Sequence, residues 1–428
     1  MYEIGIVNGR VYLGKEFKVM NVYIKDGKFA EITKEKRACE REIDATKKMV
    51  LPGFIDGHVH LSYQDGEFIS ADDFESGSKT AAYGGVTTFM DFLEPISHED
   101  QFKEAFNKRM KMGEMSAIDY GFHGTVGNFT GDTDKLKKMC KSSGITSIKV
   151  YTTYSELDRK CPDDVIYQLL DPEMMVLAHC EEEAMLKRRW LAPSTYEKSR
   201  PAMAERSAAL HLAGLAEKKE GNLYIAHVSA GSTLDMIKLK FPGLIGKKIF
   251  LESCPHYFYL SDVKLNNNDG NLYLTNPPLR DGKELMRLRR SFHLVDTIAS
   301  DHCPFMIEDK MKYEKAYQVP KGLDGLEYTF PLMFNLFGDQ VISKYTSKPA
   351  ELFGLKNKGE IRVGKDGDAV IFDNTLSNTI RESHSKSDYT VYEGLKIRGK
   401  ITTTISRGQV IMSDDVYYGG KGQYLRRG

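Results

Sequence analysis

The sequence predicts an α/β protein: a (β/α)8 TIM barrel with a small β-sandwich domain formed by both chain ends. Through the middle of the chain, short apolar β-rich runs alternate with helical stretches, as in parallel sheets whose strands are joined by helices. There are eight such runs, the number in a closed barrel. The alternative, a doubly wound open sheet, lacks support because no Gly-rich phosphate-binding turn follows an early strand.

Both chain ends carry short β-like pieces instead. The first contains YEIGIVNGRVYLG and MNVYIKDGKFAEI, where Asn-Gly and Asp-Gly pairs predict hairpin turns. GEIRVGKDGDAVIFD and GKITTTISRGQVIMSDD repeat the pattern near the C-terminus. Neither piece has enough strands for a stable sheet alone, and chain termini commonly lie close together. We therefore expect residues 1–50 and 356–428 to form one β-sandwich domain, the latter with a tail, around a barrel of residues 51–355.

The eight expected barrel strands follow one another with helices between most of them. In order they are LPGFIDGHVH, VTTFMDF, DYGFHGTV, SIKVYTTY, MMVLAHC, LYIAHVS, KIFLESC and VDTIASDHC. The first helical stretch, DDFESGSKTAAYGG, offers Asp72 and Glu75 as a capping box. The connection between the fifth and sixth strands is enlarged and contains the Ala- and Leu-rich stretch AMAERSAALHLAGLAEKK.

Composition excludes several classes of partner. Lys plus Arg equals Asp plus Glu at 60 each, so no basic field favours nucleic acid or an anionic membrane. No apolar run approaches the roughly 18 residues of a membrane-spanning helix, and the N-terminus lacks signal-peptide features. The six cysteines contain no CxxC and are typical of free thiols in a reducing compartment. We expect a cytoplasmic protein with a small-molecule substrate.

Potential metal ligands stand at the ends of the predicted strands. Side chains alternate along a strand, so His58 and His60 project to one face. His179, His227 and Asp301 end the fifth, sixth and eighth strands, and barrel enzymes build their sites at these ends. Each residue alone has an ordinary alternative, a core histidine or an N-capping aspartate. Together they predict a divalent metal site, since imidazole and carboxylate suit zinc and its neighbours.

Lys149 lies inside the apolar fourth strand, IKVY. An unpaired buried charge is costly, and both burial and nearby cations lower the pKa of an amine. A neutral amine can take up carbon dioxide as a carbamate, whose two anionic oxygens suit a position beside two metals. The alternative is a lysine that pairs with a carboxylate.

The motifs HVH, IKVYTTY, AHCEE, IAHVSAGS and IASDHCPF, in this order, resemble the amidohydrolase superfamily. Within it, the chain is most similar to the hydantoinase/dihydropyrimidinase group of cyclic amidases. SADDFESGSKTAAYGGVTTFMDF, SKPAELFGLKNKGEIRVGKDGDAVIFD and YEGLKIRGKITTTISRGQVI carry the same likeness, which covers nearly the whole chain. The resemblance implies a barrel with a bipartite β-sandwich.

The resemblance also implies a binuclear site. His58, His60 and Asp301 hold the more buried metal, His179 and His227 hold the other, and carboxylated Lys149 bridges both, with Zn2+ as the first choice and Mn or Co as alternatives.

A hydroxide bridging the two metals then attacks a ring amide carbonyl. Tyr154 stabilises the oxyanion, and Asp301 carries the proton to the leaving nitrogen. The implied activity is that of a hydrolase of cyclic C–N bonds, and the implied assembly is a homotetramer or dimer whose C-terminal tail reaches a neighbour.

Some positions depart from the hydantoinase pattern. Asn276, in TNPPLR, replaces a Ser and is typical of dihydroorotases, whereas Lys321 replaces an Asn. The Arg with which dihydroorotases bind a carboxylate after HxH is absent, because Leu61 and Ser62 stand there. We therefore predict a neutral five- or six-membered cyclic diamide as substrate, bound by Tyr154, Asn276 and Lys321.

Two loops are expected to cover the pocket and to set the preference for a ring substituent. They are the loop between Tyr63 and Asp72, with Gly66 and Glu67, and the loop after Tyr154.

Other functions remain open at this stage. Dihydroorotase and allantoinase are the enzymatic alternatives, and a mononuclear deaminase fits less well because such enzymes lack the fourth-strand lysine. A non-catalytic dihydropyrimidinase-like scaffold is the alternative from another class. Every ligand position is filled, which favours catalysis, and metal content would separate the two.

Overall fold

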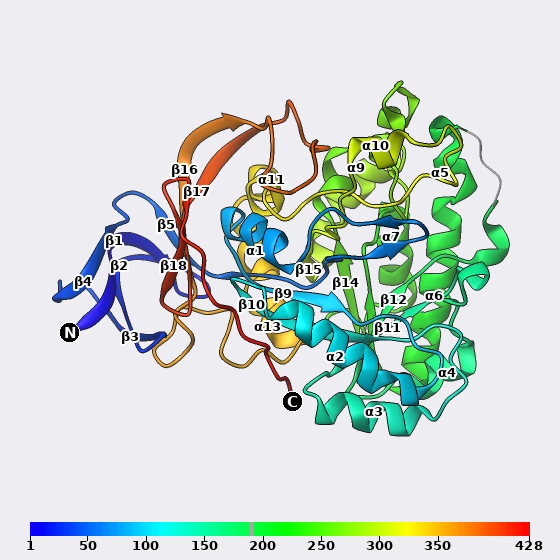
Figure 1. Ribbon diagram of the computed structural model, residues 1–428, viewed down its shortest axis with the longest axis horizontal. Helices are drawn as coiled ribbons and strands as arrows, with labels where there is room; N and C mark the ends of the chain where they lie inside the picture. Colours follow the sequence, from blue (N-terminus) through cyan, green and yellow to red (C-terminus); the bar gives the residue numbers. More distant parts are fainter. Residues whose placement is uncertain (188–191) are drawn as a thin grey trace.

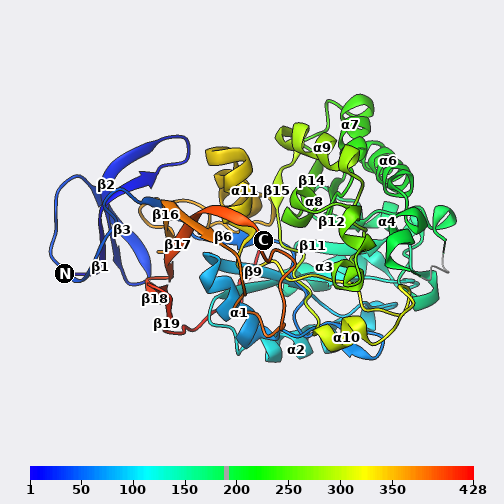
Figure 2. The ribbon, with the colours of Figure 1, turned by 90° about the horizontal axis from the view of Figure 1, so that it is seen from above.

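The computed structural model describes residues 1–187 and 192–428 and contains two main sheets (Figure 1). A parallel eight-stranded sheet forms a barrel, and a mostly antiparallel nine-stranded sheet lies beside it. The second sheet joins blue N-terminal strands to orange and red C-terminal strands (Figures 1 and 2). The predicted fold class is confirmed.

The eight barrel strands are consecutive neighbours, from the first to the last along the chain. They are β6 (Phe54–Asp56), β9 (Val86–Phe92), β10 (Asp119–Thr125), β11 (Ser147–Tyr151), β12 (Met175–His179), β13 (Asn222–Ile225), β14 (Ile249–Ser253) and β15 (Thr297–Ile298). Just beyond β6 and β15 the chain closes the barrel, where His60 N–H donates to His302 O at 2.9 Å. Closure of the barrel brings the segment with His58 and His60 next to the segment with Asp301.

The run expected as the first barrel strand is divided between the two sheets. β5 (Met49–Pro52) pairs with the end sheet, and β6 begins the barrel after Gly53. A Cβ on Gly53 would stand 2.2 Å from Thr87 Oγ1, so the chain can cross between the sheets here only with glycine.

The helices surround the barrel sheet (Figure 2). They are α1 (Phe74–Tyr83), α2 (Phe102–Gly113), α3 (Thr133–Ser142), α4 (Asp163–Leu169), α5 (Tyr196–Ser199), α6 (Ala202–Lys219), α7 (Gly231–Lys240), α8 (Pro255–Tyr259), α9 (Gly282–Arg290), α10 (Ile307–Met311), α11 (Thr329–Phe337), α12 (Ile342–Tyr345) and α13 (Ser347–Leu352). The capping box of α1 uses Asp73 and Ser76, not Asp72 and Glu75. Asp72 instead accepts from His302 Nε2 at 2.9 Å and is buried.

The nine-stranded sheet has its own core. Its strands are β1 (Tyr2–Tyr12), β2 (Phe17–Lys25), β3 (Lys28–Thr33), β4 (Cys39–Asp44), β5, β16 (Ala369–Thr379), β17 (Lys396–Ser406), β18 (Gln409–Ser413) and β19 (Val416–Tyr417). Buried Ile6, Val22, Ile371 and Ile405 belong to one cluster, so residues from both chain ends stabilise one another.

Of the two turn dipeptides, one was interpreted correctly. Asp26-Gly27 turns β2 into β3, with φ of 53° and 71°. Asn8-Gly9 forms a bulge inside β1, where Asn8 has φ of 60° and its N–H donates to Asn21 Oδ1. The prediction of a hairpin there was wrong because the residues on both sides of this dipeptide pair with the same strand, β2, so the chain runs on instead of turning back.

The C-terminal tail lies along the chain's own barrel. Tyr120 N–H donates to Gln423 O at 3.0 Å, and Leu425 N–H donates to Tyr120 O at 2.7 Å. Arg427 is buried, and its Nη1 donates to Ser147 Oγ at 2.9 Å. Nothing among the described helices combines the length and apolar character that a bilayer crossing requires.

Candidate active site

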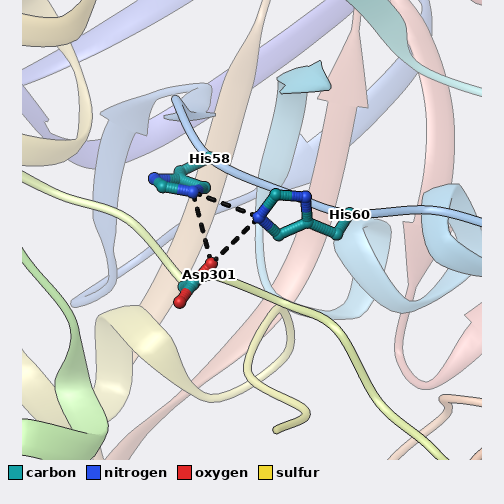
Figure 3. A group of neighbouring side chains, drawn as sticks. All are labelled: His58, His60 and Asp301. Atoms are coloured by element: carbon teal, nitrogen blue, oxygen red, sulfur yellow. Dashed lines mark hydrogen bonds and ion pairs between the residues drawn. The ribbon is translucent and has the colours of Figure 1, made fainter. Parts of the chain in front are cut away.

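His58, His60 and Asp301 converge beyond the ends of β6 and β15 (Figure 3). His58 Nε2 and His60 Nε2 are 3.2 Å apart, and Asp301 Oδ1 lies 3.3 and 3.2 Å from them. Ligands about 2.0–2.2 Å from one tetrahedral zinc ion stand about 3.3–3.5 Å from each other. The three atoms therefore have the separations of ligands to a single ion.

A second histidine pair lies beside this group. His179 Nδ1 and His227 Nε2 are 3.1 Å apart, and the His227 ring centroid is 5.4 Å from that of His58. His227 Nδ1 has no hydrogen-bond partner within residues 1–187 and 192–428. Burial lowers the pKa of both imidazoles, which favours the neutral form that binds metals. This pair also fits a divalent cation.

Lys149, on β11, lines the same cavity as both histidine groups. Its side chain is 1% exposed, and Nζ lies 5.2 Å from the Phe92 ring centroid. No carboxylate in the described part of the chain forms an ion pair with it, so the expected alternative of a carboxylate partner is not seen. Burial lowers the pKa of the Lys149 amine, although the charges of Glu252 and Asp301 oppose the shift.

Glu252, on β14, fixes the orientation of two predicted ligands. Its Oε1 accepts from His58 Nδ1 at 2.8 Å and from His227 N–H at 2.9 Å. Its Oε2 accepts from Tyr224 Oη at 2.6 Å. A proton held on Nδ1 leaves the lone pair of His58 Nε2 directed at His60 and Asp301. Glu252 thereby selects the tautomer that can bind a metal.

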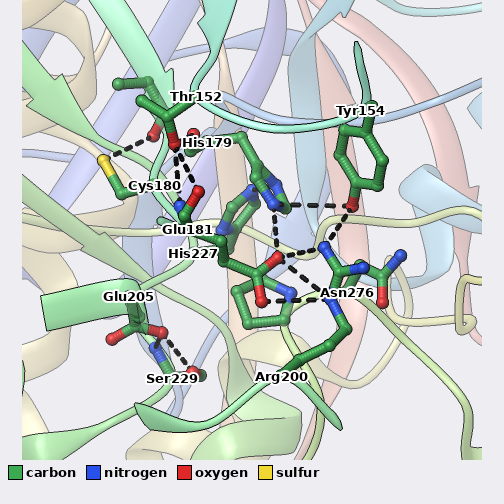
Figure 4. Close-up of polar contacts among 12 residues, drawn as sticks. Thr152, Tyr154, His179, Cys180, Glu181, Arg200, Glu205, His227, Ser229 and Asn276 are labelled. Carbon is green, nitrogen blue, oxygen red and sulfur yellow. Dashed lines mark hydrogen bonds and ion pairs between the residues drawn. The ribbon is translucent and has the colours of Figure 1, made fainter. Parts of the chain in front are cut away.

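Glu181 performs the same task for His179 and extends the network to Tyr154 (Figure 4). His179 Nε2 donates to Glu181 Oε2 at 2.7 Å, which leaves the Nδ1 lone pair facing His227. Arg200 Nε donates to Glu181 Oε1 at 3.0 Å, and Arg200 Nη2 donates to Tyr154 Oη at 3.0 Å. Since Tyr154 Oη accepts from Arg200, its own proton is directed elsewhere.

Three of these residues have left-handed backbone conformations. The φ angles of Tyr154, His227 and Asp301 are 71°, 39° and 50°. Such conformations cost roughly 1–2 kcal/mol for a residue with a Cβ. Strain of this kind clusters at functional sites, where the surrounding structure over-determines it.

One cavity of about 690 Å3 is lined by every residue predicted for the site. Its volume lies in the range of about 300–1,000 Å3 found for small-molecule pockets. We call the part of its surface that the ligand groups form the floor; these residues are His58, His60, Lys149, His179, His227 and Asp301. Both expected loops contribute to the rest of its surface, which we call the wall: Tyr63, Gly66 and Glu67 come from one loop and Leu157 from the other.

Two of the three predicted substrate contacts, Asn276 and Lys321, lie on this wall. Asn276 Oδ1 accepts from Tyr196 Oη at 2.5 Å, which leaves the amide NH2 group without a protein acceptor in the described chain and able to donate into the cavity. Lys321 Nζ donates to the main-chain oxygens of Ala316, at 2.7 Å, and Val319. Burial lowers the pKa of Lys321 to about 7.

The sequence interpretation did not single out Glu252, Glu181, Arg200 or Arg159. Glu252 interrupts the apolar strand KIFLES, a signal that could have been used as that of Lys149 was. Arg159 and Arg200 lie in loops, where no periodicity reveals which way a side chain points.

The family model, the curated relatives and the solved structures that match this chain all point to the same group of enzymes. Residues 49–411 match the model of the Amidohydrolase family. A D-phenylhydantoinase of Escherichia coli O9:H4 (strain HS) is 31% identical over 417 residues, with 90% of this chain and 89% of that protein covered.

Solved structures with the same fold include a D-hydantoinase from Bacillus sp. AR9, with a TM-score of 0.93, 28% identity and 99% of each chain covered. A dihydropyrimidinase from Brevibacillus agri NCHU1002 has a TM-score of 0.91 and 27% identity, with 100% of this chain and 99% of that chain covered.

Proposed function

We propose a cyclic amidase activity from a premise that the comparisons establish: the chain belongs to the amidohydrolase family. The reaction is hydrolysis of the ring amide of a hydantoin or a dihydropyrimidine, the substrate classes named for its relatives. The observation that carries the proposal is the convergence of two histidine pairs, Asp301 and Lys149 on one cavity.

The ligand set fits two divalent ions, for which Zn2+ is our choice. His58, His60 and Asp301 would hold one, and His179 and His227 the other. Lys149, carboxylated on Nζ, would bridge them, since its buried amine has no ion-pair partner in the described chain. When bound, the ions supply a water of lowered pKa and Lewis acidity at the amide carbonyl.

The protein's own groups then handle the proton and the developing charge. Asp301, in contact with His58 and His60, would accept the proton of the attacking water and deliver it to the leaving ring nitrogen. Tyr154, oriented by Arg200, would donate its hydroxyl proton to the oxyanion. The amide NH2 group of Asn276 and the wall near Lys321 would orient the ring.

The test is hydrolysis of hydantoin, dihydrouracil, dihydroorotate and allantoin by protein expressed with zinc and bicarbonate. We expect hydantoin or dihydrouracil to be opened, and the activity to be lost in Lys149→Ala. A protein that holds stoichiometric metal but opens none of the four compounds would contradict the proposal. A protein without stoichiometric metal would indicate a scaffold.

Dihydroorotase activity is the second candidate, favoured by Asn276. Turnover of dihydroorotate alone in the same panel would establish it.

For the cellular context, we propose a cytoplasmic homo-oligomer, a tetramer or a dimer, with the domain division at residues 50 and 355. The six free cysteines support a reducing compartment. Light scattering of the purified protein would measure the assembly state.

A further inference from the structure

Arg159 points at the cavity from a loop with a fixed backbone. The loop follows β11, and its turn is closed by hydrogen bonds from Leu157 N–H and Arg159 N–H to Tyr154 O, at 3.0 and 3.1 Å. Asp158 adopts φ of 52°, and its carbonyl accepts from Asn128 N–H at 2.8 Å. Arg159 itself is half-buried and lines the cavity. Its side chain is therefore displayed from a rigid support.

One aromatic ring separates Arg159 from a predicted metal ligand. The Arg159 guanidinium carbon lies 5.3 Å from the Tyr63 ring centroid, and Arg159 Nη1 donates to Tyr63 Oη. The same tyrosine ring is 5.2 Å from the ring of His60. A cyclic amide at the ligand groups would thus extend a short ring substituent toward the guanidinium.

Arg159 carries a charge that no carboxylate neutralises at contact distance within residues 1–187 and 192–428. Its hydrogen bonds to described residues use one of five side-chain N–H donors. Asp65, one of the acidic residues of the cavity, accepts from Lys321 N–H at 3.1 Å and lies outside ion-pair distance of Arg159. Arg200, by contrast, is paired with Glu181.

Resting on the proposed function, we propose that the natural substrate is a hydantoin or dihydropyrimidine whose ring substituent ends in a carboxylate bound by Arg159. A planar guanidinium with free parallel donors matches a carboxylate, and such charge-assisted bonds are strong in a half-buried site. The arginine with which dihydroorotases bind a carboxylate after HxH is absent from this sequence, and its absence predicts a neutral substrate. The fold supplies a guanidinium to the same cavity from another loop, and the proposed carboxylate substituent departs from the neutral substrate that the sequence predicts.

The reaction itself is unchanged. Water adds to the ring carbonyl carbon, the carbonyl C–N bond breaks, and the ring nitrogen takes up a proton, which yields an open-chain N-carbamoyl acid. The substituent carboxylate takes no part in bond making and serves only in recognition.

The test compares 5-(2-carboxyethyl)hydantoin with its neutral isostere, 5-(2-carbamoylethyl)hydantoin. We expect the zinc-loaded protein to open the acid with the lower KM. Arg159→Gln should raise the KM for the acid about 10- to 100-fold, the effect of losing hydrogen bonds to a charged group, and leave the amide unchanged. Arg159→Lys should recover part of the loss, because it keeps the charge but not the fork geometry.

Lys160→Gln is the matched control. It removes a positive charge from the next residue, which pairs with Glu183 at 3.3 Å and does not line the cavity. It should leave the KM ratio of the two compounds unchanged. Equal KM values for acid and amide in the wild type, or equal effects of Arg159→Gln on both, would overturn the inference while the proposed function stands.

If neither compound nor any of the four panel compounds is opened, the proposed function fails, and calorimetry with the acid then tests the inference separately. Binding of the acid that Arg159→Gln abolishes would support recognition by Arg159. Absence of binding, or binding that is insensitive to the substitution, would overturn it.

Discussion

The floor and the wall of the cavity are built differently. The floor, made of the ligand groups, stands at or just beyond the ends of parallel strands, and its histidines are held by buried carboxylates such as Glu252. The wall, made by Tyr63, Arg159 and Lys321, comes from loops and is held largely by bonds to main-chain atoms and to other side chains of the wall.

The difference teaches which part of the site can vary. Moving a floor residue disturbs a strand register and a buried carboxylate together, whereas a wall residue can change with little effect on the barrel. We therefore expect floor substitutions to abolish chemistry and wall substitutions to change the choice of substrate.

Lys149→Ala should have the largest effect, a loss of at least about 10³-fold in kcat, because it removes the group proposed to join the two ions. Elemental analysis should show lost metal. A carbamate signal in 13C NMR spectra recorded after growth in labelled bicarbonate should disappear. Lys141→Ala, which removes an exposed lysine on α3, is the control and should leave all three properties unchanged. Full metal content and activity in Lys149→Ala would refute the expectation that substitutions in the floor abolish chemistry.

Tyr154→Phe should lower kcat about 10²- to 10³-fold, the loss found when one oxyanion donor is removed. Metal content should stay at the wild-type value, since the tautomer of His179 is fixed by its 2.7 Å bond to Glu181, whereas its contact with Tyr154 Oη is 3.5 Å long. Steady-state kinetics and elemental analysis together check both parts. Tyr167→Phe, a phenol outside the cavity, is the matched control. A change in KM with an unaltered kcat would assign Tyr154 to binding alone.

Most of the floor could be predicted from the sequence, and little of the wall. The HxH pattern, the lysine in IKVY and the polar ends of later strands follow from alternation and from the strand-end rule, and the structure brings these side chains to one cavity. The left-handed backbone of His227 and Asp301 could not be predicted, because tertiary contacts impose it on residues that disfavour it. Arg159 meets Tyr63 across 96 positions, a contact that no local pattern encodes.

Glu252→Gln should weaken metal binding about 10- to 100-fold, the usual effect of losing a carboxylate that orients a ligand. Glu252 accepts hydrogen bonds from three donors, on His58, Tyr224 and His227. A glutamine at this position has a single acceptor oxygen, which can face either His58 or Tyr224 but not both. Competition with a zinc chelator measures the affinity. Asp163→Asn is the matched control, because it removes an exposed His–carboxylate pair of the same 2.8 Å length between Asp163 and His211. An unchanged zinc affinity would show that Glu252 does not contribute to metal binding.

The smallest effect is expected at the wall, for Tyr63→Phe. The ring that Arg159 stacks on remains, and only the hydroxyl acceptor for Arg159 Nη1 is lost. One hydrogen bond contributes about 0.5–1.5 kcal/mol net, so the KM for 5-(2-carboxyethyl)hydantoin should rise about 2- to 10-fold while that for the neutral isostere stays constant.

In the Arg159→Gln background, Tyr63→Phe should add nothing for the acid, since the group that it positions is already gone. An additive effect in the double variant would mean that Tyr63 contacts the substrate directly. A lower KM for the acid in the single variant would mean that the hydroxyl competes with the substrate for the guanidinium. Either result would still locate the choice of substituent in the wall, whereas a loss of bound metal would show that the contact of the Tyr63 ring with His60 couples wall and floor.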